Sequence, residues 1–191
     1  MDFIELEPMQ EEKDAYKPLR QETKGTTYIY KLYGEVGVPE DYLEVVDVLE
    51  KAEKGDTFII DLFSDGGYVD GYFAIAHALI RTKATTVARI QKAASAAAMI
   101  ALTCDKIETN LFSVMMAHAY SGGNSGKRNE LKIKQEFDDR FYTFVVQNIY
   151  STFFTEDEIE RIEGGEDKWL DVHDIQERLK NWVPMRKRGK L

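Results

Sequence analysis

The chain has 191 residues, of which 43% are hydrophobic and 31% are charged, and its formal net charge is −9 at pH 7. This length and hydrophobic content suit one domain with its own core. The acidic balance argues against nucleic-acid binding, because an acidic surface repels phosphate backbones. The N-terminus lacks the basic and apolar regions of a secretory signal, and no apolar run is long enough to span a membrane, so we expect a soluble, cytoplasmic protein.

The two ends of the chain differ in composition from its body. Residues 1–25 are polar, acid-rich and aperiodic, which is typical of an arm. Residues 183–191 form a basic tail that contains Arg186, Lys187, Arg188 and Lys190, and we interpret it as a solvated segment. Residues 26–182 are expected to form the folded domain. The lone cysteine, Cys104, cannot form an internal disulfide, and its apolar surroundings favour a packing role over a nucleophilic one.

Short apolar runs alternate with helical patterns through the body of the chain. The predicted strands are 27–33 (ending at Gly34), 58–63, 85–90, 106–109 and 113–116. The predicted helices are 40–53 (apolar at Leu43, Val46, Val48 and Leu49), a helix after Gly67 (apolar at Phe73, Ile75, Ala76, Leu79 and Ile80), 93–102, 127–152 (with a stripe of Ile133, Phe137, Phe141, Val145 and Ile149), 155–163 and 171–180. This alternation predicts an α/β fold with a largely parallel sheet and one protruding long helix.

The segment Ser64-Asp65-Gly66-Gly67 follows a predicted strand and precedes a predicted helix. Two glycines let the backbone turn tightly and approach a ligand closely. Their amides would then point toward an anion-sized space near the start of a helix. An ordinary turn between a strand and a helix explains the same residues, and on these residues alone that simpler interpretation is favoured.

Ser95 lies at the start of a helix of very small residues, directly after a strand. Small neighbours let a substrate backbone approach the hydroxyl, and the free amides of a helix start can stabilise an oxyanion. The alternative is that Ser95 caps the helix within a tightly packed core.

His118 ends a predicted strand, whereas His77 lies in a helical pattern and His173 in the acidic C-terminal part. A serine hydroxyl needs a base to remove its proton, and the base needs a third group to fix its tautomer. Ser95 and His118 can supply the first two roles, and a structural role for His118 is the alternative. Composition does not choose the third group, because 34 acidic residues are available.

The motifs together resemble the proteolytic subunit of the Clp protease family. That family carries Ser-Pro-Gly-Gly, Gly-x-Ala-Ala-Ser, Val-Met-x-His and Gly-Gly-x-x-Gly followed by a long helix. This chain shows SDGG, KAASAAA, VMMAH and GGNSG in the same order, and the likeness extends from about residue 26 to 180. It differs from the family at Asp65 (proline in the family), at Gln91 (glycine) and at Met116-Ala117, which lengthens the histidine motif by one residue. These departures suggest a divergent member of the type that phages encode for capsid maturation.

The resemblance implies a fold, an activity and roles for particular residues. The fold would be the Clp protease and crotonase type, with repeated ββα units and a handle helix. The activity would be serine endopeptidase, with Ser95 as nucleophile and His118 as base. The acid would be Asp167, or failing that Asp171. The oxyanion hole would be the amides of Gly67 and Ala96. Substrate would be lined by Gly66, Gly122 and Gly123.

The family's assembly and partners follow from the same resemblance. We expect a homo-oligomeric ring, either a heptamer or stacked rings, that acts on peptides or unfolded proteins without a metal or cofactor. The segment GGNSGKR at 122–128 lacks the spacing of a Walker A loop. Any use of ATP would therefore belong to a separate AAA+ unfoldase.

Three other interpretations of the sequence remain open. Lys92 could act as the base of a Ser/Lys dyad, although His118 is available. An enzyme of the enoyl-CoA hydratase type on the same fold would use carboxylates and a CoA slot, and no candidates for these are evident. A catalytically inactive ring-forming scaffold is the third, although such relatives typically lose the serine or the histidine.

Overall fold

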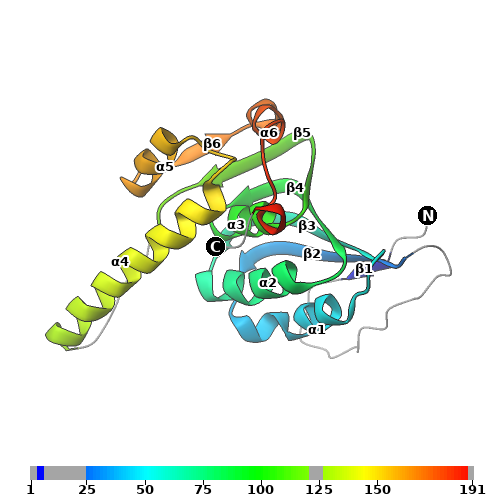
Figure 1. Cartoon of the computed structure of the whole chain (residues 1–191), viewed down its shortest axis with the longest axis horizontal. Helices are drawn as coiled ribbons and strands as arrows, with labels where there is room; N and C mark the ends of the chain where they lie inside the picture. The colour runs from blue at the N-terminus through cyan, green and yellow to red at the C-terminus, as the bar shows by residue number, and fades with distance from the viewer. Residues whose placement is uncertain (1–3, 7–24, 121–126, 189–191) are drawn as a thin grey trace.

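The computed structural model describes residues 4–6, 25–120 and 127–188 (Figure 1). Its strands are β1 (Ile4–Leu6), β2 (Thr27–Val36), β3 (Thr57–Gly67), β4 (Thr85–Ala94), β5 (Lys106–Ala117) and β6 (Lys168–Leu170). Its helices are α1 (Leu43–Lys51), α2 (Val69–Arg81), α3 (Ala96–Thr103), α4 (Arg128–Tyr150), α5 (Glu156–Glu163) and α6 (Val172–Leu179), with 3₁₀ turns η1 (Pro39–Tyr42) and η2 (Met185–Lys187). None of the helices in these ranges is both long enough and apolar enough to cross a bilayer.

The strands form one sheet in the order β1-β2-β3-β4-β5-β6. Neighbours from β1 to β5 pair in parallel, and β6 pairs antiparallel with β5. Helices α1, α2 and α3 make the crossovers between successive parallel strands, as a parallel sheet requires. The predicted α/β class with a largely parallel sheet is therefore confirmed.

The core lies between the sheet and the crossover helices. Alternate residues of the strands, such as Leu32, Ile60 and Ile90, are buried against α2 and α3 in one large apolar cluster. The opposite face of the sheet carries a small separate cluster of Ile29, Ile59 and Val87. This division follows from the two-residue repeat of a strand, which sends neighbouring side chains to opposite faces.

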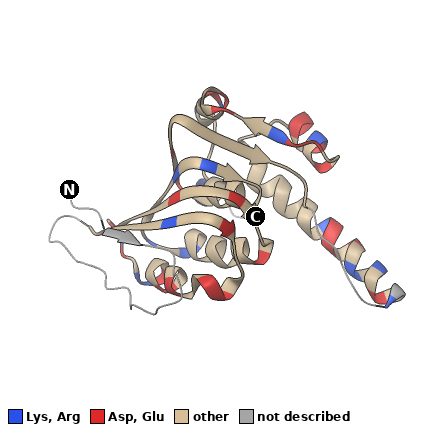
Figure 2. Ribbon diagram, turned by 180° about the vertical axis from the view of Figure 1, so that it is seen from behind, with Lys and Arg blue, Asp and Glu red and all other residues tan. Residues whose placement is uncertain are grey.

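A row of charged residues crosses that opposite face. The backbone register places Lys31, Asp61, Arg89 and Glu108 side by side on β2, β3, β4 and β5, so that the sign alternates along the row. Figure 2, the view from behind, shows charges of both signs along the central strands. Arg89 Nε donates to Glu108 Oε2 at 3.3 Å. This face of the sheet therefore carries a row of alternating charges between its small apolar cluster and the exposed aromatic pair of Tyr33 and Phe63.

Helix α4 projects away from the rest of the domain (Figure 1), as the sequence predicted for its long helix. The predicted stripe is buried only toward its C-terminal end, where Ile149 packs in the core. Toward the other end, Ile133 is 70% exposed and Phe137 52% exposed. The outer half of α4 therefore presents apolar side chains that this chain does not cover.

The strands extend further than the sequence predicted. Gly34 does not end β2; it has a positive φ of 99° and lies where the pairing with β3 changes register. Likewise the SDGG segment is not a turn, because β3 continues through Gly67. The predicted strands 106–109 and 113–116 are the two halves of β5, which is continuous. These extensions place Ser64–Gly67 within β3 and put Ser95 and His118 directly after the ends of β4 and β5.

Two predicted apolar faces are partly wrong. The α-helix begins only at Leu43, after the turn η1, rather than at residue 40. In α1, Val45 and Leu49 face the core, while Leu43 is exposed. In α2, Tyr72, Ile75 and Leu79 are buried, whereas Ile80 is exposed. The helices at 155–163 and 171–180 are confirmed as α5 and α6, within a residue or two at each end.

The chain ends also differ from the prediction. Within the predicted arm, β1 pairs in parallel with β2 at the edge of the sheet. In the predicted solvated tail, Arg186 forms a largely buried ion pair with Asp105 at 2.5 Å and donates to the carbonyl oxygens of Thr82 and Ala84. Arg188 donates to the carbonyl oxygen of Val183 at 2.8 Å. The interpretation as a solvated tail is therefore wrong for both arginines, and Lys190 lies outside the described residues.

Candidate active site

Ser95 occupies the junction between β4 and α3 in an unusual backbone conformation. Its φ of 55° and ψ of −125° lie outside the regions that residues with a side chain normally adopt. Its amide donates to the Met116 carbonyl at 2.9 Å, and its own carbonyl accepts from Met99 at 3.2 Å. Its hydroxyl makes no capping bond to α3, so the alternative of an N-cap serine does not hold. Strained residues of this kind cluster at functional sites, because the surrounding packing must enforce them.

His118 directly follows β5 and meets the Ser95 side chain. The pairing of Ala94 with Met116 sets the ends of β4 and β5 side by side. His118 Nε2 lies 2.6 Å from Ser95 Oγ. With the proton of the imidazole on Nδ1, the hydroxyl can donate to Nε2, which is the arrangement that a general base needs. The structure therefore brings together the serine and the histidine that the sequence singled out.

Asp167 lies on the other side of the imidazole. It precedes β6, whose antiparallel pairing of Lys168 with Ala117 sets it opposite His118. Asp167 Oδ1 is 3.9 Å from His118 Nδ1, and the Asp167 side chain is 60% exposed. This separation suits an ion pair with a protonated imidazole but is longer than a hydrogen bond. Ser95 and Asp167 therefore lie at the two different nitrogens of the imidazole, and the contact with Asp167 is the looser of the two.

The fallback carboxylate, Asp171, has a different task. Its Oδ1 accepts from the amides of His173 at 2.8 Å and Asp174 at 3.0 Å, which caps α6. The bond from the Asp174 amide, followed by the one from His173, lowers the pKa of the Asp171 carboxyl. Since one carboxylate oxygen is committed to the helix start, Asp167 is the better placed of the two for His118.

The strand that follows Asp167, β6, is held by a cluster of charges that sequence reasoning missed. Glu158 receives two 2.7 Å bonds from Arg178 and lies 3.0 Å from the ammonium of Lys168, the residue after Asp167. The Arg178 guanidinium is the main reason that the pKa of the Glu158 carboxyl is well below its usual range. The sequence did contain a signal for the position of Glu158. Thr155 and Glu158 have the spacing of a capping box, and they form one at the start of α5.

Gly66 and Gly67 lie on the opposite side of Ser95 from His118. A Cβ atom on Gly66 would lie 2.5 Å from Ser95 Cβ, so the two backbones are in direct contact. The Gly66 amide donates to Ser64 Oγ at 3.1 Å. Gly67 is paired with Val36 of β2. Ala96 opens α3, and the amides of a first helical turn have no acceptor within their own helix. Of the residues predicted to line the substrate, Gly122 and Gly123 lie outside the described residues.

A cavity of about 290 Å³ adjoins the segment after His118. Tyr120 and Tyr142 stack at its wall with ring centroids 3.9 Å apart. Burial, followed by the neighbouring Tyr120, raises the pKa of Tyr142 to about 12. The other lining residues are Ala119, Asp139, Thr143, Val146 and Glu163. Neither Ser95 nor His118 lines this hollow, which begins one residue beyond His118.

The other candidate nucleophile and base are not at this site. The Lys92 ammonium pairs with the Asp65 carboxylate, whereas Ser95 Oγ contacts His118 Nε2. Cys104 is fully buried, and that burial raises the pKa of its thiol, so it is not a reactive thiolate. His77 and His173 are exposed on α2 and α6.

Among residues 4–6, 25–120 and 127–188, no group of three or more histidine, cysteine, aspartate or glutamate side chains could hold a metal ion. No protein-family model matches the chain, and a search of curated proteins found no match. The geometry of the site is therefore the basis for any functional assignment.

Proposed function

We propose that the chain is a serine endopeptidase of the Clp protease proteolytic-subunit type, with Ser95 as nucleophile, His118 as general base and Asp167 as the group that orients the imidazole. One observation carries the proposal: the 2.6 Å contact between His118 Nε2 and Ser95 Oγ, made by a serine whose φ is 55°. A serine that only packed in a core would not need this strained backbone, whereas a nucleophile gains exposure of its hydroxyl from it.

The proposed reaction proceeds through an acyl-enzyme. His118 Nε2 accepts the Ser95 proton while Oγ forms a bond to the substrate carbonyl carbon, and the carbonyl π electrons move to oxygen. The resulting oxyanion would be held by the amides of Gly67 and Ala96. Collapse breaks the bond to nitrogen, and His118 donates its proton to the leaving amine. Water then repeats the sequence on the ester, which releases the acid and restores Ser95.

The strand geometry supports the finer fold assignment within the proposal. Register changes interrupt the pairing of β2 with β3 near Tyr33, of β3 with β4 near Leu62, and of β4 with β5 near Ile90. Each of these strands is thus divided into an inner and an outer half before its helix begins. A repeated ββα unit, as in the Clp protease and crotonase fold, has this form.

The exposed apolar side chains of α4 support the assembly part of the proposal. Ile133, Phe137 and Phe144 lie at the surface of a helix that extends beyond the domain. Large apolar residues grouped on one element commonly mark contacts between proteins. A homo-oligomeric ring in which α4 is the handle, in cooperation with a separate AAA+ unfoldase, would act on peptides or unfolded proteins.

A fluorophosphonate probe with mass mapping tests the proposal directly. Covalent modification at Ser95, absent in Ser95→Ala, is the expected result, and native mass determination on the same sample reports the assembly. In a peptidase assay, Ser95→Ala should lose about six decades in turnover. A hydratase-type enzyme would keep its turnover of an enoyl thioester in Ser95→Ala, and a scaffold would show no labelling and no turnover in either form.

A further inference from the structure

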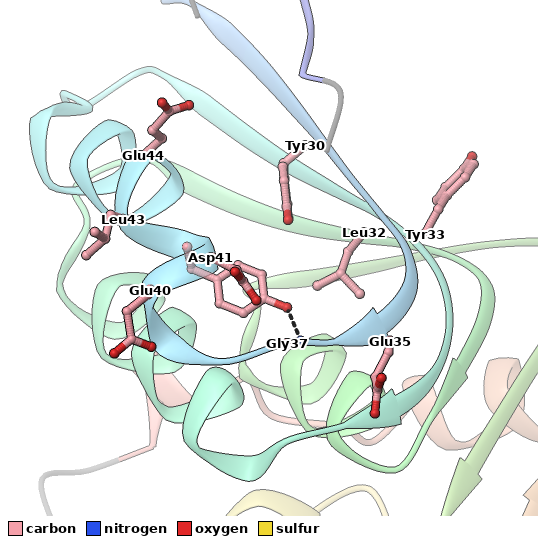
Figure 3. A pocket seen from close by; sticks show the side chains of 10 residues that line it. Tyr30, Leu32, Tyr33, Glu35, Gly37, Glu40, Asp41, Leu43 and Glu44 are labelled. Carbon is pink, nitrogen blue, oxygen red and sulfur yellow. Dashed lines mark hydrogen bonds between the residues drawn. The ribbon is translucent and has the colours of Figure 1, made fainter. Parts of the chain in front are cut away.

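A second cavity lies between β2 and the start of α1 (Figure 3) and takes no part in the proposed reaction. Its volume is about 620 Å³, within the usual range of small-ligand pockets. Two tyrosines, Tyr30 and Tyr42, form its buried wall, with ring centroids 6.5 Å apart in an edge-on arrangement. Leu32 completes the apolar part of that wall.

The rim of this cavity is strongly acidic. Four carboxylates line it, from Glu35, Glu40, Asp41 and Glu44, and none of its ten lining residues is a lysine or an arginine. None of the four forms an ion pair with another residue in the described part of the chain. Burial is the main cause that raises the pKa of both tyrosines, and the Asp41 charge adds to it. The tyrosines therefore remain neutral hydroxyls within a negative potential.

The two tyrosine hydroxyls differ in their hydrogen bonding. The Tyr42 oxygen accepts from the Gly37 amide at 2.8 Å, the dashed line in Figure 3. Tyr30 is only 8% exposed, yet its hydroxyl has no hydrogen-bond partner among the described residues. In Figure 3 its side chain points into the hollow beside Leu32 and Asp41. The Tyr30 hydroxyl is not one of the fully enclosed polar atoms of the described residues, so its oxygen is open to the hollow and can accept a bond from a ligand group there.

We propose that this cavity binds an organic cation, an ammonium or guanidinium group carried on an aliphatic chain. The four carboxylates supply the charge, the tyrosine rings supply faces for a cation–π contact, and the Tyr30 oxygen accepts a bond from an N–H donor. The aliphatic chain packs against Leu32. The same acidic rim disfavours phosphate, carboxylate and nucleic-acid ligands. The proposal is independent of the proposed peptidase activity, since no residue of the Ser95 site is used.

Two sources carry this chemistry, a free polyamine and a basic side chain of a polypeptide. Spermidine represents the first, and N-acetyl-arginine amide and N-acetyl-lysine amide represent the second. N-acetyl-citrulline amide is the matched neutral probe, because it keeps the shape of arginine without the charge. Ligand-observed saturation-transfer NMR measures the weak affinities expected for single side chains, and it works for large assemblies. The protein is the full chain with Ser95→Ala, which prevents turnover.

We expect saturable binding of at least one cationic probe, with the citrulline probe weaker by about tenfold or more. Adding salt should weaken binding of the cationic probe, because the carboxylates are at the surface and salt screens their charge. The double variant Glu40→Gln/Glu44→Gln alters only exposed side chains and should weaken binding by about threefold to tenfold. Tyr30→Phe keeps the ring and removes the free hydroxyl, with a similar expected loss. Tighter binding of spermidine would indicate a free polyamine, and tighter binding of the arginine or lysine amide would indicate a polypeptide side chain.

The matched control is Glu130→Gln/Glu160→Gln, which removes the same charge from exposed positions on α4 and α5, away from the cavity. It should leave binding unchanged. Equal affinity for the arginine and citrulline probes, or an equal loss in both double variants, would overturn the proposal, as would the absence of saturable binding by every cationic probe.

Discussion

A methyl group on Gly66 would place its carbon 2.5 Å from Ser95 Cβ, because the end of β3 passes directly beside the start of α3. The same carbon would also lie 2.8 Å from the Ala94 carbonyl oxygen and 3.1 Å from the Ala96 nitrogen. Atoms without a bond between them do not approach so closely, so any side chain at this position must displace the backbone around the serine. The glycine is therefore part of what positions Ser95.

We predict that Gly66→Ala will lower turnover and fluorophosphonate labelling by about a hundredfold or more, since displacement of a nucleophile by about 1 Å has effects of that size. The matched control is Gly34→Ala. Both glycines have a φ near 98–99°, but a Cβ on Gly34 would meet no atom within 4 Å. Gly34→Ala should therefore lose about 1–2 kcal/mol of stability from its backbone alone and keep its labelling rate. Equal labelling by the two variants would show that the contact with Ser95 has no role.

The carboxylate assignment can be tested with two conservative substitutions. Asp167→Asn removes the charge beside His118 and, under the proposed function, is expected to lower turnover by about three to four decades, the loss seen when serine peptidases lack their triad acid. Asp171→Asn should leave turnover unchanged, because asparagine caps a helix about as well as aspartate does. The measurement is turnover of a fluorogenic peptide, with thermal unfolding as the check on folding. A large loss in Asp171→Asn alone would reverse the assignment.

The sequence could predict Ser95 and His118 because both follow runs whose composition marks them as strands, and parallel strands end at one edge of a sheet. The position of the third group, Asp167, was not predictable in the same way. Asp167 is positioned by β6, a strand of only three residues in which Trp169 is exposed. So short a run has no alternation of apolar and polar residues from which a strand could be predicted. Its distance from His118 depends on how α5 and α6 pack, which involves the long-range pairing of Glu158 with Arg178.

Local chemistry also explains why β5 was predicted as two strands. Between its halves the Asn110 amide donates to Ser113 Oγ at 2.8 Å, and the Phe112 amide donates to Asn110 Oδ1 at 2.8 Å. Asparagine and serine in such bonds are typical of turns. Here they lie inside one strand, where its pairing with β4 is irregular, and Ser113 Oγ also donates to the Ile90 carbonyl of β4 at 2.6 Å. That last contact joins residues 23 apart and is invisible to local patterns.

The Glu158 cluster predicts a particular dependence of stability on pH. The folded pKa of Glu158 is below the value of about 4.3 that a glutamate has in an unfolded chain. Its contribution is therefore fully present above that value and is lost as the pH falls through the lower folded pKa. Near neutral pH, Glu158→Gln should lower the free energy of unfolding by about 2 kcal/mol.

Urea unfolding at a series of pH values measures this contribution. The difference between the parent chain and Glu158→Gln should be constant near neutrality and should narrow on acidification below about pH 4. Glu160→Gln, an exposed neighbour on α5, is the matched control and should change stability by no more than about 0.5 kcal/mol. A difference that stays the same at low pH would show that the effect of Glu158→Gln does not come from the charge.

The contact between Arg186 and Asp105 predicts that the C-terminal segment stabilises the fold. The Arg186 guanidinium bonds to both Asp105 oxygens and to the carbonyl oxygens of Thr82 and Ala84, and the two side chains are largely buried. Removing one partner leaves the other charge buried without compensation. Arg186→Met should therefore lower the free energy of unfolding by about 3–5 kcal/mol, whereas Lys187→Met, at an exposed position, should change it by at most about 0.5 kcal/mol.

Adding Asp105→Asn to Arg186→Met should restore part of the loss, because the unpaired charge is removed with its partner. If Arg186→Met and Lys187→Met unfolded at the same denaturant concentration, the segment would not be docked through this pair.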